Sequence, residues 1–380
     1  MDTRTIRTYL LHKQALIKKK SMAELSALVH QQLGLHSTDY LTPYISLWNR
    51  IQDFDPEEFF TSLNKLTYLR KRAYRGTVFI IDKNLFPIIN STSKSFAQSW
   101  FKGFKKELDK KNVDFNSLRN QVITLFKEHK SLTVRELKKH IASSEIIPSK
   151  WYSLLLRYYE LDGTLVRTTH RYLEDKVIRY ELVETIFPDI FNDPLDFNDA
   201  IDELFILYLK QYGPITIDDF SWWLPITKTK CKELIAKFED DITKTTLNNQ
   251  DHFFLKTDFQ ALKKFNCPDE PVINFLPYED HFPKAYINRE WYLAKKFQSD
   301  IIGQKTITRG QLWPSIWLNY TIIGKWEIIY QDKKKTSVKI KINNLFNNNF
   351  LRTSIRKEIE KQRTELEKFL NKELLPLNKN

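Results

Sequence analysis

Apolar residues near the N-terminus recur at the spacing of one face of an α-helix, in residues 3–16 and again in residues 21–33. Residues 55–66 repeat this pattern behind an Asp-Pro pair, which is typical of a helix start. Residues 67–82 then change to β-branched and aromatic residues on both sides of Gly76, as in a β-hairpin. The pattern therefore predicts helices followed by a strand pair, which is the order of elements in a winged helix.

The same order of elements is predicted twice more along the chain. Residues 114–182 contain a short helix with Thr133 and Glu136 at the spacing of a capping box, a longer helix over residues 148–161, and a final hairpin. Residues 196–256 repeat this order. The three segments form a loose repeat of about 80 to 95 residues, which favours tandem winged helices.

The pattern changes after about residue 266. Strand-like runs separated by turn residues occupy residues 271–277, 311–331 and 335–343, and they predict a small antiparallel sheet or barrel. Residues 351–374 then form a heavily charged segment at helical spacing. We expect this last segment to be a solvated helix.

Together these patterns predict an α+β protein. Tandem winged-helix (helix-turn-helix) subdomains are expected to be arranged around a small C-terminal antiparallel β-barrel, and the length of the chain agrees with several subdomains. The predicted boundaries are 1–95 for a first winged helix with the candidate catalytic turn, 96–192 for a second, 193–266 for a third, 267–348 for the barrel-like domain and 349–380 for the charged helix.

The charge balance indicates the kind of partner. The 380 residues include 60 Lys and Arg against 47 Asp and Glu, which gives a formal net charge of +13. A basic protein of this kind attracts phosphate-bearing molecules, so double-stranded DNA is the expected partner. The alternative is that the lysines are only solvated around the surface.

The remaining composition narrows the class of protein further. Cys231 and Cys267 lack the spacing of metal ligands, and there is no Gly-rich phosphate loop, so we expect neither a metal nor another cofactor. No stretch approaches the roughly 20 apolar residues that span a bilayer. We expect a cytoplasmic protein without membrane contact, associated with the nucleoid when it is bound to DNA.

Two groups of cations are candidates for contact with DNA phosphates. One lies on the first hairpin, and the other lies in the first turns of the helix that would be the recognition helix of the third repeat. The alternative for the hairpin group is an edge strand that is protected by its charges. The candidate residues are Arg70, Lys71, Arg72 and Arg75 in the hairpin, and Lys228, Lys230 and Lys232 in the helix.

A polar cluster interrupts the apolar pattern of residues 33–51, LGLHSTDYLTPYISLWNRI. It consists of His36, Ser37, Thr38 and Asp39, between two segments of helical spacing. Thr38 or Asp39 can cap a helix that starts near Tyr40, and His36 can be a loop histidine bonded to the backbone. A catalytic turn is the other interpretation, and a capped turn holds its side chains rigidly in either case.

Two further groups favour structural roles. Trp222 and Trp223 lie on a helical face beside apolar residues, which favours packing over stacking with bases. Asp280 and His281 lack a second polar partner nearby in the sequence, which favours a turn of the barrel over a catalytic pair.

Three stretches resemble a known family, the winged-helix DNA glycosylases of the AlkZ and YcaQ type, which repair alkylated and crosslinked bases. They are GLHSTDYLTPYISLWNRI followed by YRGTVFII, then YLKQYGPITIDDFSWWL, and finally INFLPYEDHF with REWYLAKK and PSIWLNYTIIGKW. The matches keep their order and extend from about residue 3 to residue 345. The resemblance implies winged helices in a concave arrangement around a small barrel, embracing duplex DNA as a monomer.

The family resemblance also implies a catalytic Gln-x-Gln or Gln-x-Asp motif beside the lesion. Aligned without gaps, His36 stands at the first Gln, Ser37 at the spacer, Thr38 at the second Gln and Asp39 at the Asp that follows. Both glutamines are therefore replaced in this chain.

The substituted turn retains groups that suit the reaction. An N7- or N3-alkylated purine already carries positive charge, so the base leaves without protonation. Asp39 can stabilise the positive charge on the sugar, His36 can bind or deprotonate a water, and Thr38 can orient it. We therefore predict a monofunctional glycosylase that hydrolyses the N-glycosidic bond of alkylated or crosslinked purines.

Two other classes of function stay open on the sequence alone. A non-catalytic winged-helix DNA-binding protein, either a damage sensor or a transcriptional regulator, needs the same cations but no reactive turn. An RNA-binding or protein-interaction module is less favoured because the chain has no RNP-like aromatic motif.

Overall fold

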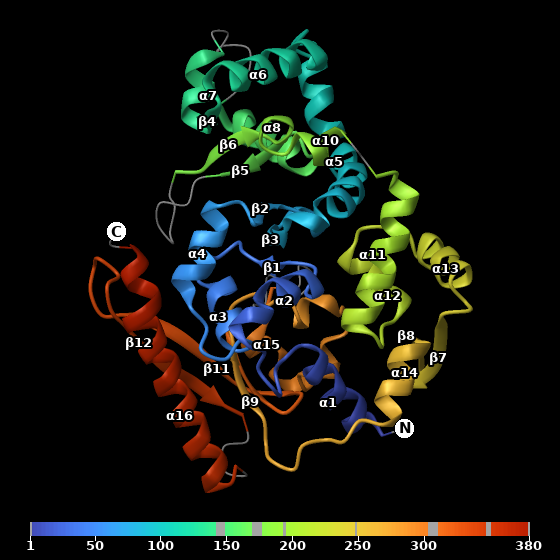
Figure 1. Cartoon of the computed structure of the whole chain (residues 1–380), viewed down its shortest axis with the longest axis vertical. Coiled ribbons are helices and arrows are strands. Elements are labelled where there is room, and N and C mark those ends of the chain that lie inside the picture. The colour runs from blue at the N-terminus through green and yellow to red at the C-terminus, as the bar shows by residue number, and fades with distance from the viewer. Residues whose placement is uncertain are drawn as a thin grey trace. The chain divides into compact units, whose positions relative to one another are not determined.

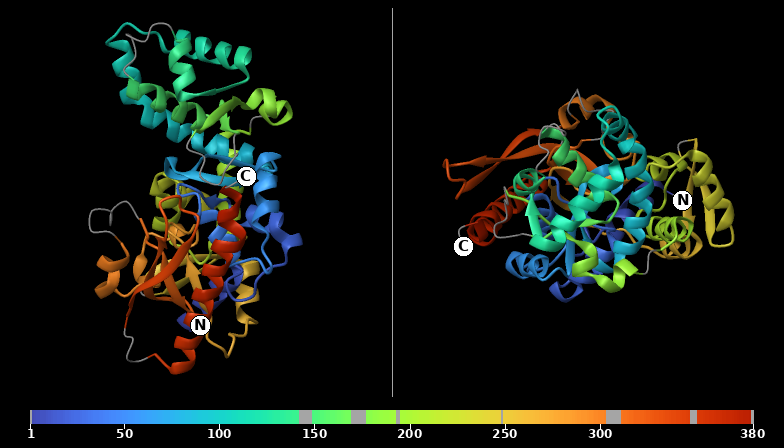
Figure 2. Two further views of the ribbon diagram at one scale, coloured as in Figure 1. Left: turned by 90° about the vertical axis from the view of Figure 1, so that its left-hand side faces the viewer. Right: turned by 90° about the horizontal axis from the view of Figure 1, so that it is seen from above.

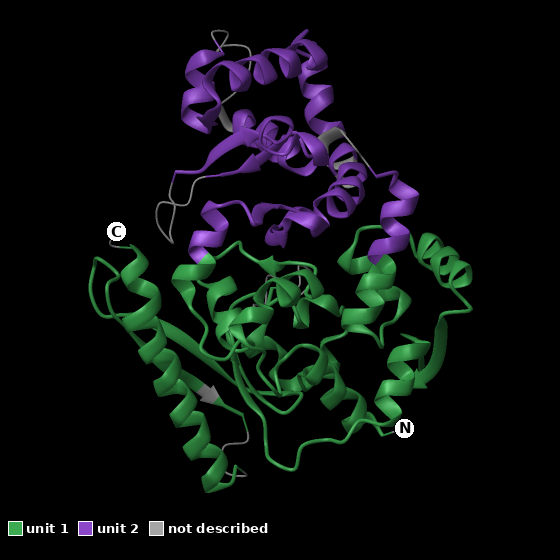
Figure 3. Ribbon diagram, in the orientation of Figure 1, with its two compact units in different colours: residues 1–59, 205–380 green, residues 60–204 purple. Residues whose placement is uncertain are grey.

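The computed structural model describes residues 2–141, 149–168, 177–192, 195–247, 249–302, 311–346 and 351–378. The chain is divided into two compact units, residues 1–59 with 205–380 and residues 60–204 (Figure 3). Helices and strands alternate in both units, so the predicted α+β class is confirmed. The finer domain boundaries given above stay predictions.

Residues 60–204 contain an antiparallel sheet in the order β3-β2-β5-β6-β4, covered by helices (Figure 1). The capping box of Thr133 and Glu136 is present, with the Glu136 amide donating to Thr133 Oγ1 over 3.1 Å. Residues 142–148 and 169–176, which include the predicted helix start at Pro148 and the tip of the second hairpin, lie outside the described residues. The elements are α4 (Pro56–Asn64, shared with the other unit), β2 (Tyr68–Arg72), β3 (Val78–Asp82), α5 (Phe86–Asp109), α6 (Phe115–His129), β4 (Ser131–Thr133), α7 (Val134–His140), α8 (Ser149–Leu161), β5 (Leu165–Arg167), β6 (Arg179–Leu182), α9 (Val183–Ile186) and α10 (Pro188–Asn192).

The other unit begins with the two predicted N-terminal helices and contains the third repeat. Ser21 and Glu24 form a capping contact, with the Ser21 amide donating to Glu24 over 3.0 Å. In the third repeat, Trp223 is buried and packs on Tyr208 with 4.7 Å between ring centroids, as the packing interpretation expects. The elements are α1 (Thr3–Lys13), α2 (Leu25–Gln31), β1 (Leu35–His36), α3 (Thr42–Trp48), α11 (Phe197–Tyr212, shared with the other unit), α12 (Ile217–Trp223), α13 (Lys228–Lys237), β7 (Ile242–Leu247), β8 (Gln250–Leu255) and α14 (Lys256–Lys263).

The C-terminal strands form an open sheet, in contrast to the predicted barrel. Their order is β12-β11-β10-β9, and all neighbours are antiparallel. Four strands are fewer than the roughly eight that close around packed side chains, and no closed barrel is found among the described strands. The remaining elements are β9 (Ile273–Leu276), α15 (Gln298–Ile301), β10 (Ser315–Leu318), β11 (Thr321–Tyr330), β12 (Val338–Leu345) and α16 (Thr353–Phe369).

Helix α16 is docked on this sheet and is only partly solvated (Figure 2). Ile359, Leu366 and Phe369 are buried, whereas most of the charged residues are exposed. Glu367 also accepts a hydrogen bond from the Ile340 amide over 2.8 Å, so the helix satisfies part of the backbone of edge strand β12. The charged segment therefore forms a helix as predicted, but one face of this helix is apolar and packs on the sheet.

Candidate active site and nucleic-acid-binding residues

The polar turn lies between α2 and α3. After α2, Leu33 and Gly34 have φ angles of 57° and 106°, and these left-handed conformations reverse the chain. His36 and Ser37 are buried, Thr38 is exposed, and Asp39 is half-buried. Within this turn, Thr38 and Asp39 are thus the side chains that solvent and a substrate can reach.

Asp39 fixes the entry into α3. Its Oδ1 accepts a hydrogen bond from the Leu41 amide over 2.9 Å, and the helix starts at Thr42 with Pro43 in its first turn. The carboxylate therefore holds the turn before the helix, which starts two residues later than the sequence pattern suggested. The structural and the catalytic interpretations of Asp39 remain compatible because the bond engages Oδ1 and the side chain remains partly exposed.

A buried acid, Glu279, lies behind the turn. His36 Nε2 is 3.4 Å from Thr38 Oγ1 and 3.8 Å from Glu279 Oε2. The Glu279 carboxylate also accepts from the Leu312 amide over 2.7 Å and from the Lys284 ammonium, so its burial is compensated. Glu279 was not predicted from the sequence, because most of the chain separates it from His36. The imidazole of His36 reaches the exposed Thr38 hydroxyl and is itself enclosed.

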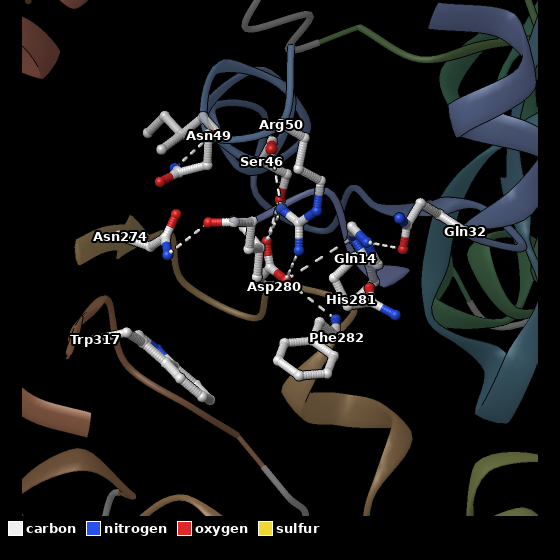
Figure 4. A network of polar contacts seen from close by, with 12 residues as sticks. Gln14, Gln32, Ser46, Asn49, Arg50, Asn274, Asp280, His281, Phe282 and Trp317 are labelled. Atoms are coloured by element: carbon white, nitrogen blue, oxygen red, sulfur yellow. Dashed lines mark hydrogen bonds and ion pairs between the residues drawn. The ribbon is translucent and has the colours of Figure 1, made fainter. Parts of the chain in front are cut away.

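The segment next to Glu279 anchors both ends of the turn (Figure 4). Asp280 accepts two hydrogen bonds from Arg50, of 2.8 and 3.0 Å, and one of 2.5 Å from Ser46 on α3. His281 Nε2 is 2.8 Å from Oε1 of Gln32, which follows α2. Asp280 and His281 are buried, which favours a structural role over a catalytic pair, although the sheet beside them is not the predicted barrel.

The protonation states in this network follow from its surroundings. Burial alone raises the pKa of Asp280, but the charge of Arg50 and the hydrogen bonds from Arg50 and Ser46 outweigh it and hold this pKa well below its usual range. Burial lowers the pKa of His281 to about 3. Asp280 is therefore ionised and His281 neutral near pH 7, and the anchor holds a fixed charge state.

A surface pocket opens beside Asp39, and we call it the aromatic pocket. Its volume is about 460 Å³. Trp313 is 44% exposed, and the Tyr278 ring meets it edge-on at 5.9 Å between centroids. The lining residues are Asp39, Leu41, Thr42, Ile45, Pro277, Tyr278, Trp313, Pro314, Lys325, Trp326, Glu327, Ile328 and Tyr330. The candidate turn therefore lies next to a concave surface with aromatic walls.

The four hairpin cations have different environments. Lys71 is fully buried and donates to Asn90 over 3.2 Å, so the expected phosphate contact does not fit this residue. Arg72 pairs with the buried Glu160 at 3.3 Å and donates to the Gly76 carbonyl. Arg70 and Arg75 are half-buried. Side chains alternate between the two faces of a strand, which is why Lys71 points away from its two neighbours and into the core.

Replacing Lys71 by Met is expected to stabilise residues 60–204. Burial lowers the pKa of Lys71 from 10.5 to about 8, although Glu160 and Asp162 oppose the shift. The charged form of Lys71 is therefore disfavoured in the folded state, which lowers the free energy of unfolding. This loss is complete below pH 8 and disappears as the pH rises from about 8 to 10.5, because in this range the folded protein has released the proton that the unfolded chain still binds. At pH 7 we expect a gain of about 1–3 kcal/mol in urea denaturation.

The same variant separates a core role of Lys71 from a DNA contact. The stabilisation should shrink at pH 10, and the affinity for duplex DNA should not change. A loss of stability at pH 7, or a tenfold loss of DNA affinity, would contradict the core role.

The lysines of α13 are the better-placed group. Thr227 caps the helix by accepting from the Lys230 amide over 3.1 Å. Lys228 is exposed and pairs with Asp218 at 2.6 Å, and Lys230 is half-buried with Glu233 at 3.7 Å. Lys232 is exposed. Exposed ion pairs of this kind are weak, so their lysines can exchange a carboxylate for a phosphate.

The structure adds a third group of cations, which is not among the residues predicted from the sequence. A pocket of about 790 Å³ is lined by Lys18, Lys19, Lys20 and Lys210, which are all exposed. His12 and His30 also line it, and its acids are Glu24 and Asp258. The run KKK at residues 18–20 was the available signal.

Features of other classes of site are not found in the described part of the chain. No group of three or more His, Cys, Asp or Glu residues there is arranged to hold a metal ion. Cys231 and Cys267 are both free thiols. None of the helices in the described residues is both long enough and apolar enough to cross a membrane.

Comparisons with known proteins agree with this architecture. A sequence model described as DNA glycosylase AlkZ-like matches residues 29–369. Among solved structures, Streptomyces sahachiroi DNA glycosylase AlkZ is similar with a TM-score of 0.78 and 18% sequence identity, over 100% of this chain and 98% of that one. At this identity the likeness shows a shared fold. No curated protein sequence matches the chain.

Proposed function

Because the chain belongs to the AlkZ-like DNA glycosylase family, we propose that it hydrolyses the N-glycosidic bond of alkylated or crosslinked purines in duplex DNA. The position of Thr38 and Asp39 carries this proposal. They are the accessible side chains of the turn that stands where the family resemblance implies the catalytic motif, and Asp39 lines the aromatic pocket. The buried contacts of Glu279, Asp280 and His281 support this geometry by fixing the turn.

The reaction needs few groups from the protein. The bond between C1′ and N9 of an N7-alkylated purine breaks, and its electron pair neutralises the cationic base. A water held by the Thr38 hydroxyl bonds to C1′, and its proton passes to the Asp39 carboxylate, which also stabilises the positive charge on the sugar. His36 lies 3.4 Å behind the Thr38 hydroxyl and acts as a positioning residue.

Cations on the unit of residues 1–59 and 205–380 supply the DNA contacts in this proposal. Lys228 and Lys232 on α13 are exposed, as are Lys18 and Lys20. The order of helices and strands in residues 115–182 and 197–255 supports winged helices, whose basic helix end meets DNA. We further propose that one chain binds double-stranded DNA as a monomer and associates with the nucleoid in this state.

Incubation with duplex DNA that contains one N7-methylguanine tests the function. We expect abasic sites, which appear as strand cleavage after heating in alkali, and no cleavage of the undamaged duplex. Affinity for DNA should fall steeply with salt because each phosphate contact releases counterions. Tight, salt-dependent binding with an intact strand at high protein excess would replace this proposal by a non-catalytic damage sensor or regulator.

A further inference from the structure

We propose that the aromatic pocket receives the damaged base itself, as an alkylated, cationic purine that has left the stack of the duplex. The inference rests on the proposed function and extends it, because it names the part of the substrate that the protein recognises. It also implies that the nucleotide is extruded, so that its C1′ lies at the edge of the pocket, next to Asp39.

The position and size of the pocket fit a base. Asp39 forms part of the wall, so a base seated there keeps its glycosidic bond close to the reactive turn. The volume of about 460 Å³ lies within the range of roughly 300–1,000 Å³ that is usual for small-ligand sites. The walls come from the start of α3 with the residues before it, the residues after β9, the residues before β10, and strand β11.

The aromatic side chains offer a flat surface for stacking. Trp313 is a large apolar residue with 44% of its surface exposed, although its neighbour Leu312 is completely buried. Tyr278 braces the indole edge-on, and Lys325 Nζ lies 4.6 Å from its centroid. Tyr330 also lines the pocket, and a hydrogen bond of 3.0 Å joins its hydroxyl to that of Tyr40. A braced, exposed indole is suited to stack with a planar ligand.

The charges around the pocket favour a cation over a neutral base. Its walls carry the carboxylates of Asp39 and Glu327 and the ammonium of Lys325. Lys341, outside the wall, pairs with Glu327 at 3.5 Å, but this pair is exposed and therefore weak. The Lys325 ammonium rests on the indole of Trp313 at 4.6 Å. Burial, followed by the negative charges of Glu279 and Asp39, raises the pKa of Tyr278 to about 12, so its hydroxyl stays protonated and can donate a hydrogen bond to a base. A base with a positive charge and a stacking face matches both properties of the wall.

Binding of a nucleoside tests the pocket separately from catalysis. The probes are 7-methylguanosine at a pH where it is cationic, and guanosine, which has the same shape without the methyl group and the charge. We expect 7-methylguanosine to bind at least tenfold more tightly, measured by calorimetry and by quenching of tryptophan fluorescence. Trp313→Ala should weaken this binding about 10- to 100-fold, and Trp313→Phe should restore most of it.

Controls keep a failure of the pocket distinct from a failure of the function. Trp313 is exposed, so its replacement should leave the circular dichroism and the thermal unfolding unchanged, and Ile329→Ala, at an exposed apolar residue of β11, is a matched control. Equal affinity for the two nucleosides, or a Trp313→Ala variant with unchanged binding, overturns the inference even if excision from DNA persists. Selective binding of 7-methylguanosine without excision from DNA would contradict the proposed function but support the assignment of the pocket.

Extrusion has its own readout in duplex DNA. Leaving the stack costs a few kcal/mol, and less when the base is mispaired. We therefore expect excision by Trp313→Ala to recover in part when N7-methylguanine stands opposite a mismatch. An identical loss in paired and mispaired substrates would contradict extrusion into this pocket.

Discussion

Replacing Asp39 by Asn should lower the single-turnover rate of base excision by about 10²- to 10³-fold, because a charge aimed at the transition state is removed. The amide oxygen of Asn can still accept the hydrogen bond from the Leu41 amide, so the turn should keep its conformation. Affinity for duplex DNA should stay within about twofold of the unchanged protein. The measurement is excision of N7-methylguanine at protein excess, with binding followed by fluorescence anisotropy.

Two matched variants sharpen this prediction. Asp300→Asn makes the same chemical change at an exposed acid of α15 and should leave the rate unchanged. Thr38→Val, which keeps the shape and removes the hydroxyl, should also slow excision. His36→Ala should abolish excision, and His36→Gln, which restores a hydrogen-bonding group behind Thr38, should recover part of it. Full activity of both Asp39→Asn and His36→Ala would place the chemistry elsewhere.

Removing the Asp280 carboxylate should produce the largest loss of stability. Asp280→Ala leaves the guanidinium of Arg50 buried without its anion, and Arg50 has 0% of its surface exposed. Breaking a buried ion pair from one side costs about 3–5 kcal/mol. We expect this loss in the free energy of unfolding, measured by urea denaturation with tryptophan fluorescence.

The control for this variant is an ion pair at the surface. Lys244 and Asp251 are 3.1 Å apart and about half exposed, so Asp251→Ala should leave the free energy of unfolding nearly unchanged. Adding Arg50→Met to Asp280→Ala should recover part of the stability, because the buried charge is then gone. A loss of less than about 1 kcal/mol for Asp280→Ala alone would show that the pair is not a structural anchor.

Local patterns in the sequence predicted the elements well and the environments of single residues poorly. The predicted capping box of Thr133 and Glu136 marks a real helix start, because a cap depends only on residues three positions away. The alternation of the strand YLRKR already contained the information that Lys71 faces opposite to Arg70 and Arg72. All four hairpin cations were nevertheless predicted to contact phosphates, because the prediction rested on their number and not on the alternation of faces.

The environment of the candidate turn could not be predicted from local patterns. Glu279 approaches His36 only because the chain folds the segment after β9 against the turn. The aromatic pocket likewise combines Asp39 with Trp313 and Tyr330, which belong to distant parts of the sequence. The family resemblance indicated the position of the turn in the sequence but not the residues that surround it. Because both glutamines of the family motif are replaced, the motif gave no further information about this site.

The docking of α16 has a consequence for association between copies of the chain. Besides the contact of Glu367, the Asn371 side chain accepts from the Val338 amide and donates to the Val338 carbonyl, each over 2.9 Å. These two side chains imitate the hydrogen bonds of an additional strand along β12. The backbone groups of Val338 and Ile340 that these side chains bond are not available to a strand from another molecule. We expect this to disfavour edge-to-edge aggregation of the sheet.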